Sequence, residues 1–306
     1  MQLFLEQLLN GLQLGVTLLL MASGLTLVLG IMNLINLTHG CLFMVGAYVG
    51  VTVAGVSGSY LLGVVAAILA AGLTGVVMEV IVLRRLYRRE HLDQILATFG
   101  LILFFNEAVR IIWGRQPLQV SLPGWLSGSV QVIPGIPYPS FRLVVVGVGV
   151  AAAVLLYLLV MRSRLGMLIR AGASNREMVD ALGTNIVVLY TLVFGLGAAF
   201  AGLAGIMAAP FVAVQSGMGS SVLILTFVVI IVGGIGSIRG AIAGALLIGI
   251  TDTLGQAYLP AFFHLWMRTS AADDVGGAMA SMSIYIVMII VLAIRPRGIF
   301  GARSYS

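Results

Sequence analysis

The stretch "LVVVGVGVAAAVLLYLLVM", residues Leu143–Met161, decides the fold class of this chain. It contains no charged side chain, and it is about as long as the roughly 20 apolar residues with which an α-helix crosses the hydrocarbon core of a bilayer. Strands of a membrane β-barrel show only a weak alternation of apolar and polar residues. The uninterrupted run therefore predicts a transmembrane α-helix.

The rest of the chain has the same character. Of its 306 residues 60% are hydrophobic and 8% are charged, and the mean hydropathy is +1.14, whereas soluble domains carry roughly 25% charged residues. We expect an all-α integral membrane protein, a polytopic bundle of about 8–10 transmembrane segments, in a single domain over residues 1–306. Some of these helices are expected to be discontinuous, near a central pathway through the membrane. Apolar runs place the spans near Leu8–Gly30, Cys41–Val56, Tyr60–Leu83, Ile95–Trp113, Phe141–Met161, Ile186–Ala208, Ser221–Ile235, Ala241–Tyr258 and Ala278–Ile294.

The basic residues indicate orientation and exclude two functions. All 16 are arginine, so the lysine of a phosphate-binding loop is missing and the chain is not itself a P-loop ATPase. The arginines lie in loops between spans, and this excludes a basic nucleic-acid-binding face. Because positively charged loops stay in the cytoplasm, residues 162–185 are expected inside and residues 114–140 outside. Five of the eight prolines lie in residues 114–140, which predicts an ordered outer cap or a plain linker.

The segment "NLINLTHG", Asn33–Gly40, interrupts the apolar pattern with amides, a hydroxyl and an imidazole. Non-helical backbone at membrane depth survives only where it is buried in protein or lines a wet cavity. A second interruption follows Ala208, and paired interruptions are typical of a central pathway. The predicted pathway residues are Asn33, Asn36, Thr38, His39, Gly40, Cys41, Pro210 and Gln215.

The sequence leaves two roles open for His39. It either bonds to backbone groups freed by the helix break, or it lines the pathway. A nucleophile–base pair with Cys41, the only cysteine, lacks a third orienting group, so no catalytic residue and no metal site is predicted. Among the charged residues near membrane ends, Glu79 is expected to snorkel or to pair with Arg84, and Glu107 is spaced to pair with Arg110.

The inner segment "RSRLGMLIRAGASNREMVDALGTN", residues 162–185, predicts a short amphipathic helix. Ser174 and Glu177 have the spacing of a capping box, and Gly183 can end the helix. Such a helix lies either along the membrane surface or in the groove of a partner.

Several blocks together resemble a known family. Arg170, Arg176, Leu182, Gly183 and Asn185 resemble the cytoplasmic coupling loop of permeases of the branched-chain amino acid ABC importer family. The stretch "GLTLVLGIMNLINLTHGCLFMVGAYVG", residues 24–50, is similar to that family's first signature. Later blocks follow in the family's order: Gly195–Pro210, "VVIIVGGIGSIRGAIAGALLIG" at residues 228–249 and "RPRGIFG" at residues 295–301. The resemblance covers nearly the whole chain and is to the LivH-like type of permease.

The resemblance implies the partners. They would be a second related permease forming a heterodimer, two ATP-binding cassette subunits and a periplasmic solute-binding protein, all at the lipid bilayer of the cell inner membrane. ATP would be bound by the partner subunits, so this chain needs no cofactor. The helix from Ser174 to Gly183 would enter a cleft of the ATPase. The residues implied in coupling are Arg170, Ser174, Asn175, Arg176, Glu177, Asp180, Leu182, Gly183 and Asn185.

The sequence departs from the family at Cys41, because many members carry an acidic residue there. The expected solute is therefore a branched-chain or hydrophobic amino acid or a related amide, urea or aromatic acid, moved by alternating access. The alternative is an ion-coupled secondary transporter that works without ATPase subunits. A further rival, an intramembrane enzyme, would need clustered His, Cys or acidic residues.

Overall fold

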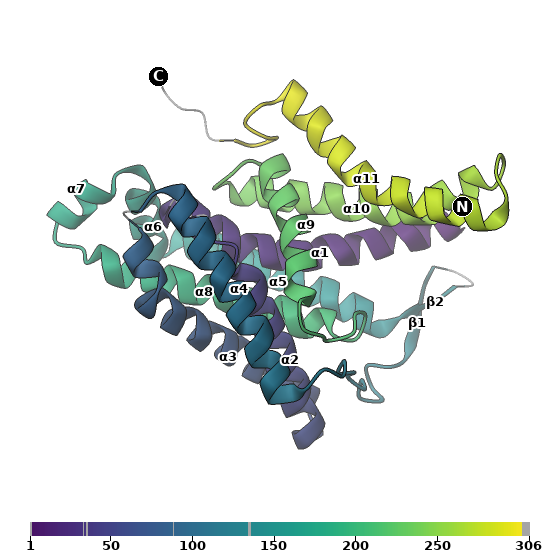
Figure 1. The fold of residues 1–306 in the computed structure, drawn as a ribbon, viewed down its shortest axis with the longest axis horizontal. Helices are drawn as coiled ribbons and strands as arrows, with labels where there is room; N and C mark the ends of the chain where they lie inside the picture. The colour runs from purple at the N-terminus through teal and green to yellow at the C-terminus, as the bar shows by residue number, and fades with distance from the viewer. Residues whose placement is uncertain (1, 33, 35, 88, 134–135, 302–306) are drawn as a thin grey trace. The chain divides into compact units, whose positions relative to one another are not determined.

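The fold is that of a polytopic helical membrane protein, as predicted. A computed structural model describes residues 2–32, 34, 36–87, 89–133 and 136–301, and this part contains eight helices that are long and apolar enough to cross a membrane. The elements in chain order, labelled in Figure 1, are α1 (Gln2–Met32), α2 (His39–Ser57), α3 (Tyr60–Ile81), the 3-10 helix η1 (Leu83–Leu86), α4 (His91–Trp113), β1 (Ser129–Ile133), β2 (Ile136–Pro139), α5 (Ser140–Arg162), α6 (Arg164–Ser174), α7 (Arg176–Ala181), α8 (Ile186–Ala208), α9 (Met218–Gly233), α10 (Ile238–Phe263) and α11 (Thr269–Ile294).

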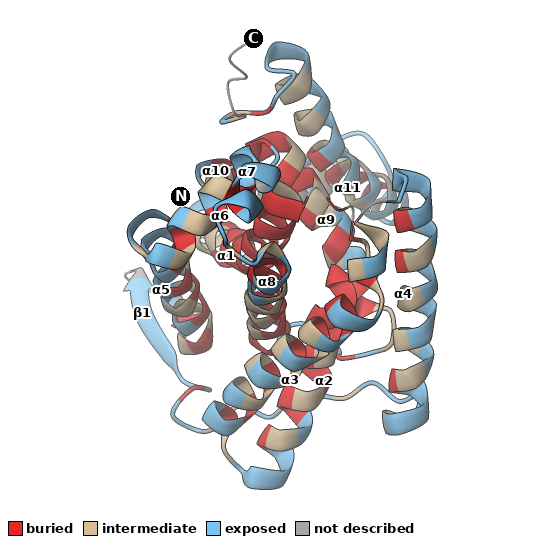
Figure 2. Ribbon diagram, turned by 90° about the vertical axis from the view of Figure 1, so that its left-hand side faces the viewer, coloured by how far each residue is buried: buried red, intermediate tan, exposed pale blue. Residues whose placement is uncertain are grey.

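Residues 20–123 and 151–225 form one compact unit. Its centre is α8, which packs against α2 and α3 and is largely buried in Figure 2. Glycines make these contacts close: a Cβ at Gly202 would overlap Ala71, and a Cβ at Gly46 would overlap the backbone of Gly202. Between helices in lipid, small residues of this kind let the backbones approach and gain van der Waals contact.

The end of α1 and the start of α2 contact opposite ends of α8. The hydroxyl of Tyr190, near the start of α8, donates to the carbonyl of Ile31 at the end of α1 (3.4 Å). A Cβ at Gly205, near the other end of α8, would overlap the carbonyl of Phe43 near the start of α2. Tyr190 and Gly205 are about 22 Å apart at the 1.5 Å rise of a helix. The chain from Ile31 to Phe43, which includes the break, therefore runs along most of the length of α8.

Residues 1–19, 124–150 and 226–306 form the second compact unit. Gly11 and Gly15 of α1 pack against α10 near Ile250 and Ala245. The strands β1 and β2 form an antiparallel hairpin in the predicted outer cap, a small exception to the all-α prediction. Two prolines in β2 are compatible with this hairpin because each of its two strands is an edge.

The segment that follows α11 forms hydrogen bonds with the last residues of α9. The N–H groups of Ile299 and Phe300 donate to the carbonyls of Val232 and Gly233 (both 2.9 Å). The last carbonyls of a helix have no intrahelical partner, so this tail satisfies two of them. Gly298 has φ +79°, which favours glycine, and a Cβ there would meet the backbone of Gly234 at 2.6 Å.

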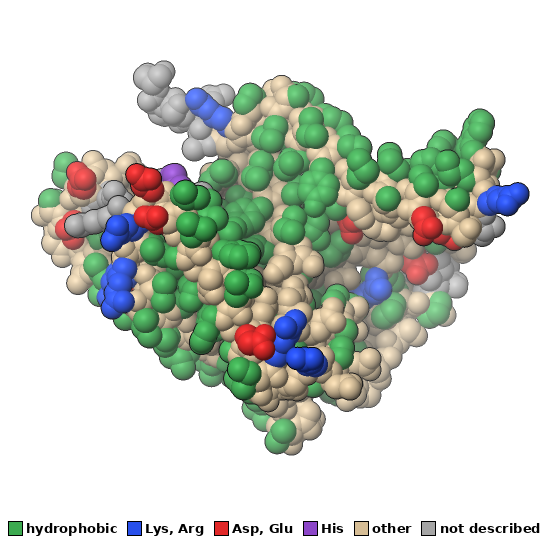
Figure 3. Space-filling view, in the orientation of Figure 1, with side chains coloured by type: hydrophobic (Ala, Val, Ile, Leu, Met, Phe, Trp, Pro, Cys, Tyr) green, Lys and Arg blue, Asp and Glu red, His purple; other side chains and the backbone are tan. Residues whose placement is uncertain are grey.

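The surface is apolar, as expected for a chain surrounded by lipid. Figure 3 shows hydrophobic side chains over much of the visible face, with charged groups in a few clusters. The outward side chains of α4 and α11 are mainly large and aliphatic or aromatic, including Phe104, Ile111, Tyr285 and Ile289. The prediction of one permease domain over residues 1–306, with an outer cap at 114–140 and a coupling loop at 162–185, stays a prediction.

Candidate functional site

The helix break places its polar side chains in the interior. Asn36, Thr38 and His39 are fully buried and Cys41 is 5% exposed. The Oδ1 atom of Asn36 accepts from the backbone N–H of Thr38 (2.9 Å) and from its hydroxyl. This Asx turn ends the non-helical segment and starts α2 at His39. Asn33, also predicted for the pathway, lies outside the described residues.

The start of α2 meets the start of α9 within the first compact unit. Gly40 and Gly219 are each the second residue of their helix, and a Cβ at either glycine would overlap the carbonyl of the other. The two predicted interruptions therefore lead into helices that cross at their first turns. Sequence reasoning missed Gly219, because only its contact with Gly40, far away in the sequence, separates it from the other glycines of the chain.

The second interruption has a different environment from the first. Pro210 is half-buried, and Gln215 is exposed. Val214 pairs with Leu118 of the predicted outer cap through two backbone hydrogen bonds (2.9 and 3.1 Å). The hydroxyl of Ser216 also donates to the carbonyl of Asn106 (3.1 Å). The cap is thus joined directly to the segment that precedes α9.

The inner segment differs from the predicted capping box. Ser174 is the last residue of α6, and the N-cap of the next helix is Asn175, whose side chain accepts from the N–H of Met178 (2.9 Å). Asparagine caps a helix as well as serine does, and α6 continues to Ser174. The predicted helix from Ser174 to Gly183 is therefore the shorter α7. Gly183 has φ +86°, so its role as a helix stop is confirmed.

Most of the predicted coupling side chains are exposed. Ser174, Glu177, Asp180 and Leu182 face outward, and Leu182 is 77% exposed although it is apolar. Asn185 caps α8 by accepting from the N–H of Val188 (3.1 Å). Arg170 is also exposed but bonds to another helix, so Arg170 and Arg176 are two separate cases.

One of the two is Arg170, whose guanidinium donates to the carbonyl of Val160 and so joins α6 to α5. The other is Arg176, whose side chain lies outside the described part. A surface cavity of about 450 Å³ lies between the α6–α7 junction and the last turn of α1, lined by residues that include Ile31, Gly172 and Glu177. The coupling segment is therefore adjacent to the point where the helix break begins.

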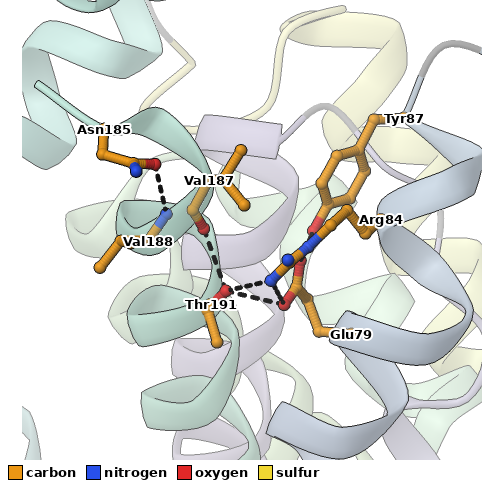
Figure 4. A network of polar contacts seen from close by, with 7 residues as sticks. All are labelled: Glu79, Arg84, Tyr87, Asn185, Val187, Val188 and Thr191. Carbon is orange, nitrogen blue, oxygen red and sulfur yellow. Dashed lines mark hydrogen bonds and ion pairs between the residues drawn. The ribbon is translucent and has the colours of Figure 1, made fainter.

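A buried ionic cluster fixes the first turns of α8, as Figure 4 shows. The Glu79 carboxylate is fully buried and accepts from Arg84 (3.0 and 3.2 Å), from the phenol of Tyr87 (2.6 Å) and from the hydroxyl of Thr191 (2.8 Å). Arg84 also donates to Thr191 (2.9 Å). Pairing of Glu79 with Arg84 was one of the two readings from the sequence, and it is confirmed.

The phenol of Tyr87 is held in its donor form. Burial, the hydrogen bond to Glu79 and the charge of that carboxylate together raise the pKa of Tyr87 well above its usual range. Its ring packs edge-on against Tyr190 with centroids 5.3 Å apart. Because Tyr190 donates to Ile31, the cluster links α3, the start of α8 and the end of α1.

Within the described residues no group of three or more His, Cys, Asp or Glu side chains could hold a metal ion. The arrangement is that of a multi-pass membrane protein with buried polar groups at a helix break and an exposed inner segment. These features are typical of a transport permease.

Comparison with known proteins identifies the family. The family described as branched-chain amino acid transport system / permease component matches residues 7–292, and the chain belongs to it. It is similar to the high-affinity branched-chain amino acid transport system permease protein LivH of Salmonella typhimurium, with 31% identity covering 97% of this chain and 96% of the relative. LivH of Escherichia coli shows the same identity and coverage.

A further relative is the permease protein BraD of Pseudomonas aeruginosa, with 29% identity covering 97% of this chain and 96% of that protein. No solved structure matches the chain.

Proposed function

We propose that this chain is one transmembrane subunit of an ATP-driven ABC importer in the cell inner membrane. The observation that carries the proposal is the match of nearly the whole chain to a family of transport permeases. The partners would be a second permease, two ATP-binding cassette subunits that hold the nucleotide, and a periplasmic solute-binding protein. This chain would carry out no covalent chemistry and would need no cofactor.

The solute class follows from the relatives. Their names describe transport of branched-chain amino acids, so leucine, isoleucine and valine are the first candidates for this chain. Amides, urea and aromatic acids form the broader class, because position 41 carries a thiol instead of a carboxylate.

Alternating access would be driven through the inner segment. ATP binding closes the two ATPase subunits and displaces α7, whose exposed residues include Met178 and Leu182. Asn185 ties this movement to α8, and the cluster of Glu79, Arg84 and Thr191 ties α8 to α3. A movement of packed rigid helices of this kind opens a central path on one side at a time.

The solute class is tested by uptake into proteoliposomes that contain the complete complex, its binding protein and internal ATP. We expect ATP-dependent uptake of leucine, isoleucine and valine and none of urea or benzoate. Uptake of urea or benzoate in preference to all three amino acids would assign the chain to a different solute within the importer class.

A further inference from the structure

Buried polar atoms that lack partners occur at the helix break and in the preceding part of α1. Within the described residues these atoms are Thr26 Oγ1, Asn36 Nδ2 and both ring nitrogens of His39. The imidazole approaches the backbone of Met21 without the geometry of a hydrogen bond. Native proteins leave few such atoms unpaired, because an unmade buried hydrogen bond costs free energy. A polar guest at this place would supply the missing partners.

The first turn of α2 lies in the same region, and there the N–H of Cys41 donates to the carbonyl of Thr38 (2.8 Å). Thr38 occupies its N-cap position but makes no side-chain cap, because its hydroxyl goes to Asn36. The starts of α3 and α8 are capped by Ser59 and Asn185, whereas α4 and α11 also lack a side-chain cap. An uncapped helix start presents unpaired N–H groups and a partial positive charge.

The groups available are donors. The Oδ1 atom of Asn36 is already occupied by Thr38, so its free Nδ2 can only donate. An imidazole has at least one N–H in either charge state, and a hydroxyl can donate as well. The sequence contains no Asp, Glu, Lys or Arg between Glu6 and Glu79. A set of donors without a local carboxylate suits an anionic group and not an ammonium group.

The crossing of α2 and α9 adds an independent reason. Gly40 and Gly219 bring the positive ends of two helices into backbone contact. The two partial positive charges repel each other at this distance. An anion bound beside them would attract both helix starts and offset the repulsion. Ser220 and Ser221, in the same turn of α9, are exposed, so polar groups continue from the crossing to the surface.

We propose that the carboxylate of the transported solute binds at the start of α2, where Asn36, His39 and the start of α9 supply the donors. The assignment rests on the proposed import function and names the part of the solute that is recognised here. Asn36 and His39 are fully buried, so the solute reaches them when the crossing at Gly40 and Gly219 opens.

The direct test measures binding of radiolabelled leucine to the wild-type complex in nanodiscs without the binding protein, so that only the membrane site contributes. We expect 4-methylpentanoate, which is leucine without its amino group, to displace the label, and leucinamide to be at least tenfold weaker. Leucinamide competing as well as 4-methylpentanoate would overturn the proposal, and so would the absence of displaceable leucine binding.

The second arm uses substitutions that change charge at nearly constant volume. Asn36→Asp keeps the oxygen that accepts from Thr38 but replaces the free donor by an oxygen, so we expect at least a tenfold rise in the KM of ATP-driven leucine uptake. The control is Asn10→Asp. The amide oxygen of Asn10 also accepts hydrogen bonds, from Tyr138 and Arg142, and this substitution should leave that KM unchanged. A wild-type KM in Asn36→Asp would mean that the site holds only water.

ATP-driven uptake by the wild type is scored separately, so its absence would refute the import function itself.

Discussion

At the scale of single residues, the sequence predicted which polar groups matter near the membrane ends but not all of their partners. The pairing of Glu79 with Arg84 and of Glu107 with Arg110 follows from spacing along one helix or its end, and both pairs are present. Thr191 lies far away in sequence, and only the packing of α8 on α3 brings it to Glu79. Local spacing carries no information about such a contact.

The two acid–arginine pairs should differ in energetic weight. Glu79→Gln removes the charge from a fully buried site and leaves Arg84 without its carboxylate, and Arg84 is 36% exposed. We expect a loss of about 1–3 kcal/mol, below the usual value for a broken buried pair because water screens Arg84. Glu107→Gln at the exposed pair should cost about 0–1 kcal/mol. Thermal unfolding of the purified complex measures both, and equal losses would contradict the burial argument.

The crossing of α2 and α9 predicts opposite effects for two glycine substitutions. A Cβ in Gly219→Ala would overlap the carbonyl of Gly40, so we expect lower stability and at least a tenfold loss of uptake. A Cβ at Gly55 meets nothing within 4 Å, and Gly55→Ala should stabilise α2 by up to about 1 kcal/mol. If Gly219→Ala behaved like Gly55→Ala in unfolding and uptake assays, the two helices would not touch at this point.

At the scale of elements, hydropathy predicted the long helices because each is a continuous apolar run. It failed where polar pairing decides the structure. The β1–β2 hairpin depends on the pairing of Ser129–Ile133 with Ile136–Pro139, which the count of prolines alone did not reveal. The start of α7 depended on a choice between two adjacent capping residues, Ser174 and Asn175.

The cap of α7 can be tested by removal and rescue. Asn175→Ala loses the bond to the N–H of Met178, which typically costs about 0.5–2 kcal/mol, a large amount for so short a helix. We expect weaker co-purification of the ATPase subunits, and recovery in Asn175→Ser because serine also caps helices. Loss of binding in both variants alike would mean that the amide contacts the partner directly.

We expect the short helix α9 to carry the chain across the membrane. With α9 as a crossing element, Arg239 lies on the arginine-rich inner side and Arg268 on the outer side, in agreement with the positive-inside rule. Cys41 is buried, so single cysteines can report sidedness. A membrane-impermeant thiol reagent should label Gln215→Cys from outside and Ile235→Cys only from inside. Labelling of both from one face would place α9 on the surface.

At the scale of the whole molecule, composition and arginine usage were enough to predict a multi-pass membrane protein, and the ordered sequence blocks were enough to predict its family. The length of the helix break along α8 was not predictable, because it follows from contacts of Ile31 and Phe43 with opposite ends of that helix. The missing phosphate-binding lysine remains the strongest argument from sequence that this chain is not itself a P-loop ATPase.

The most direct test of this account compares energy sources for leucine uptake in proteoliposomes. The complete complex with its binding protein should accumulate leucine when ATP is enclosed, and collapse of the proton and sodium gradients by ionophores should not reduce the rate. Omission of the ATPase subunits should abolish uptake. Uptake that persists without the ATPase subunits and stops when an ion gradient is collapsed would contradict the account and identify an ion-coupled transporter.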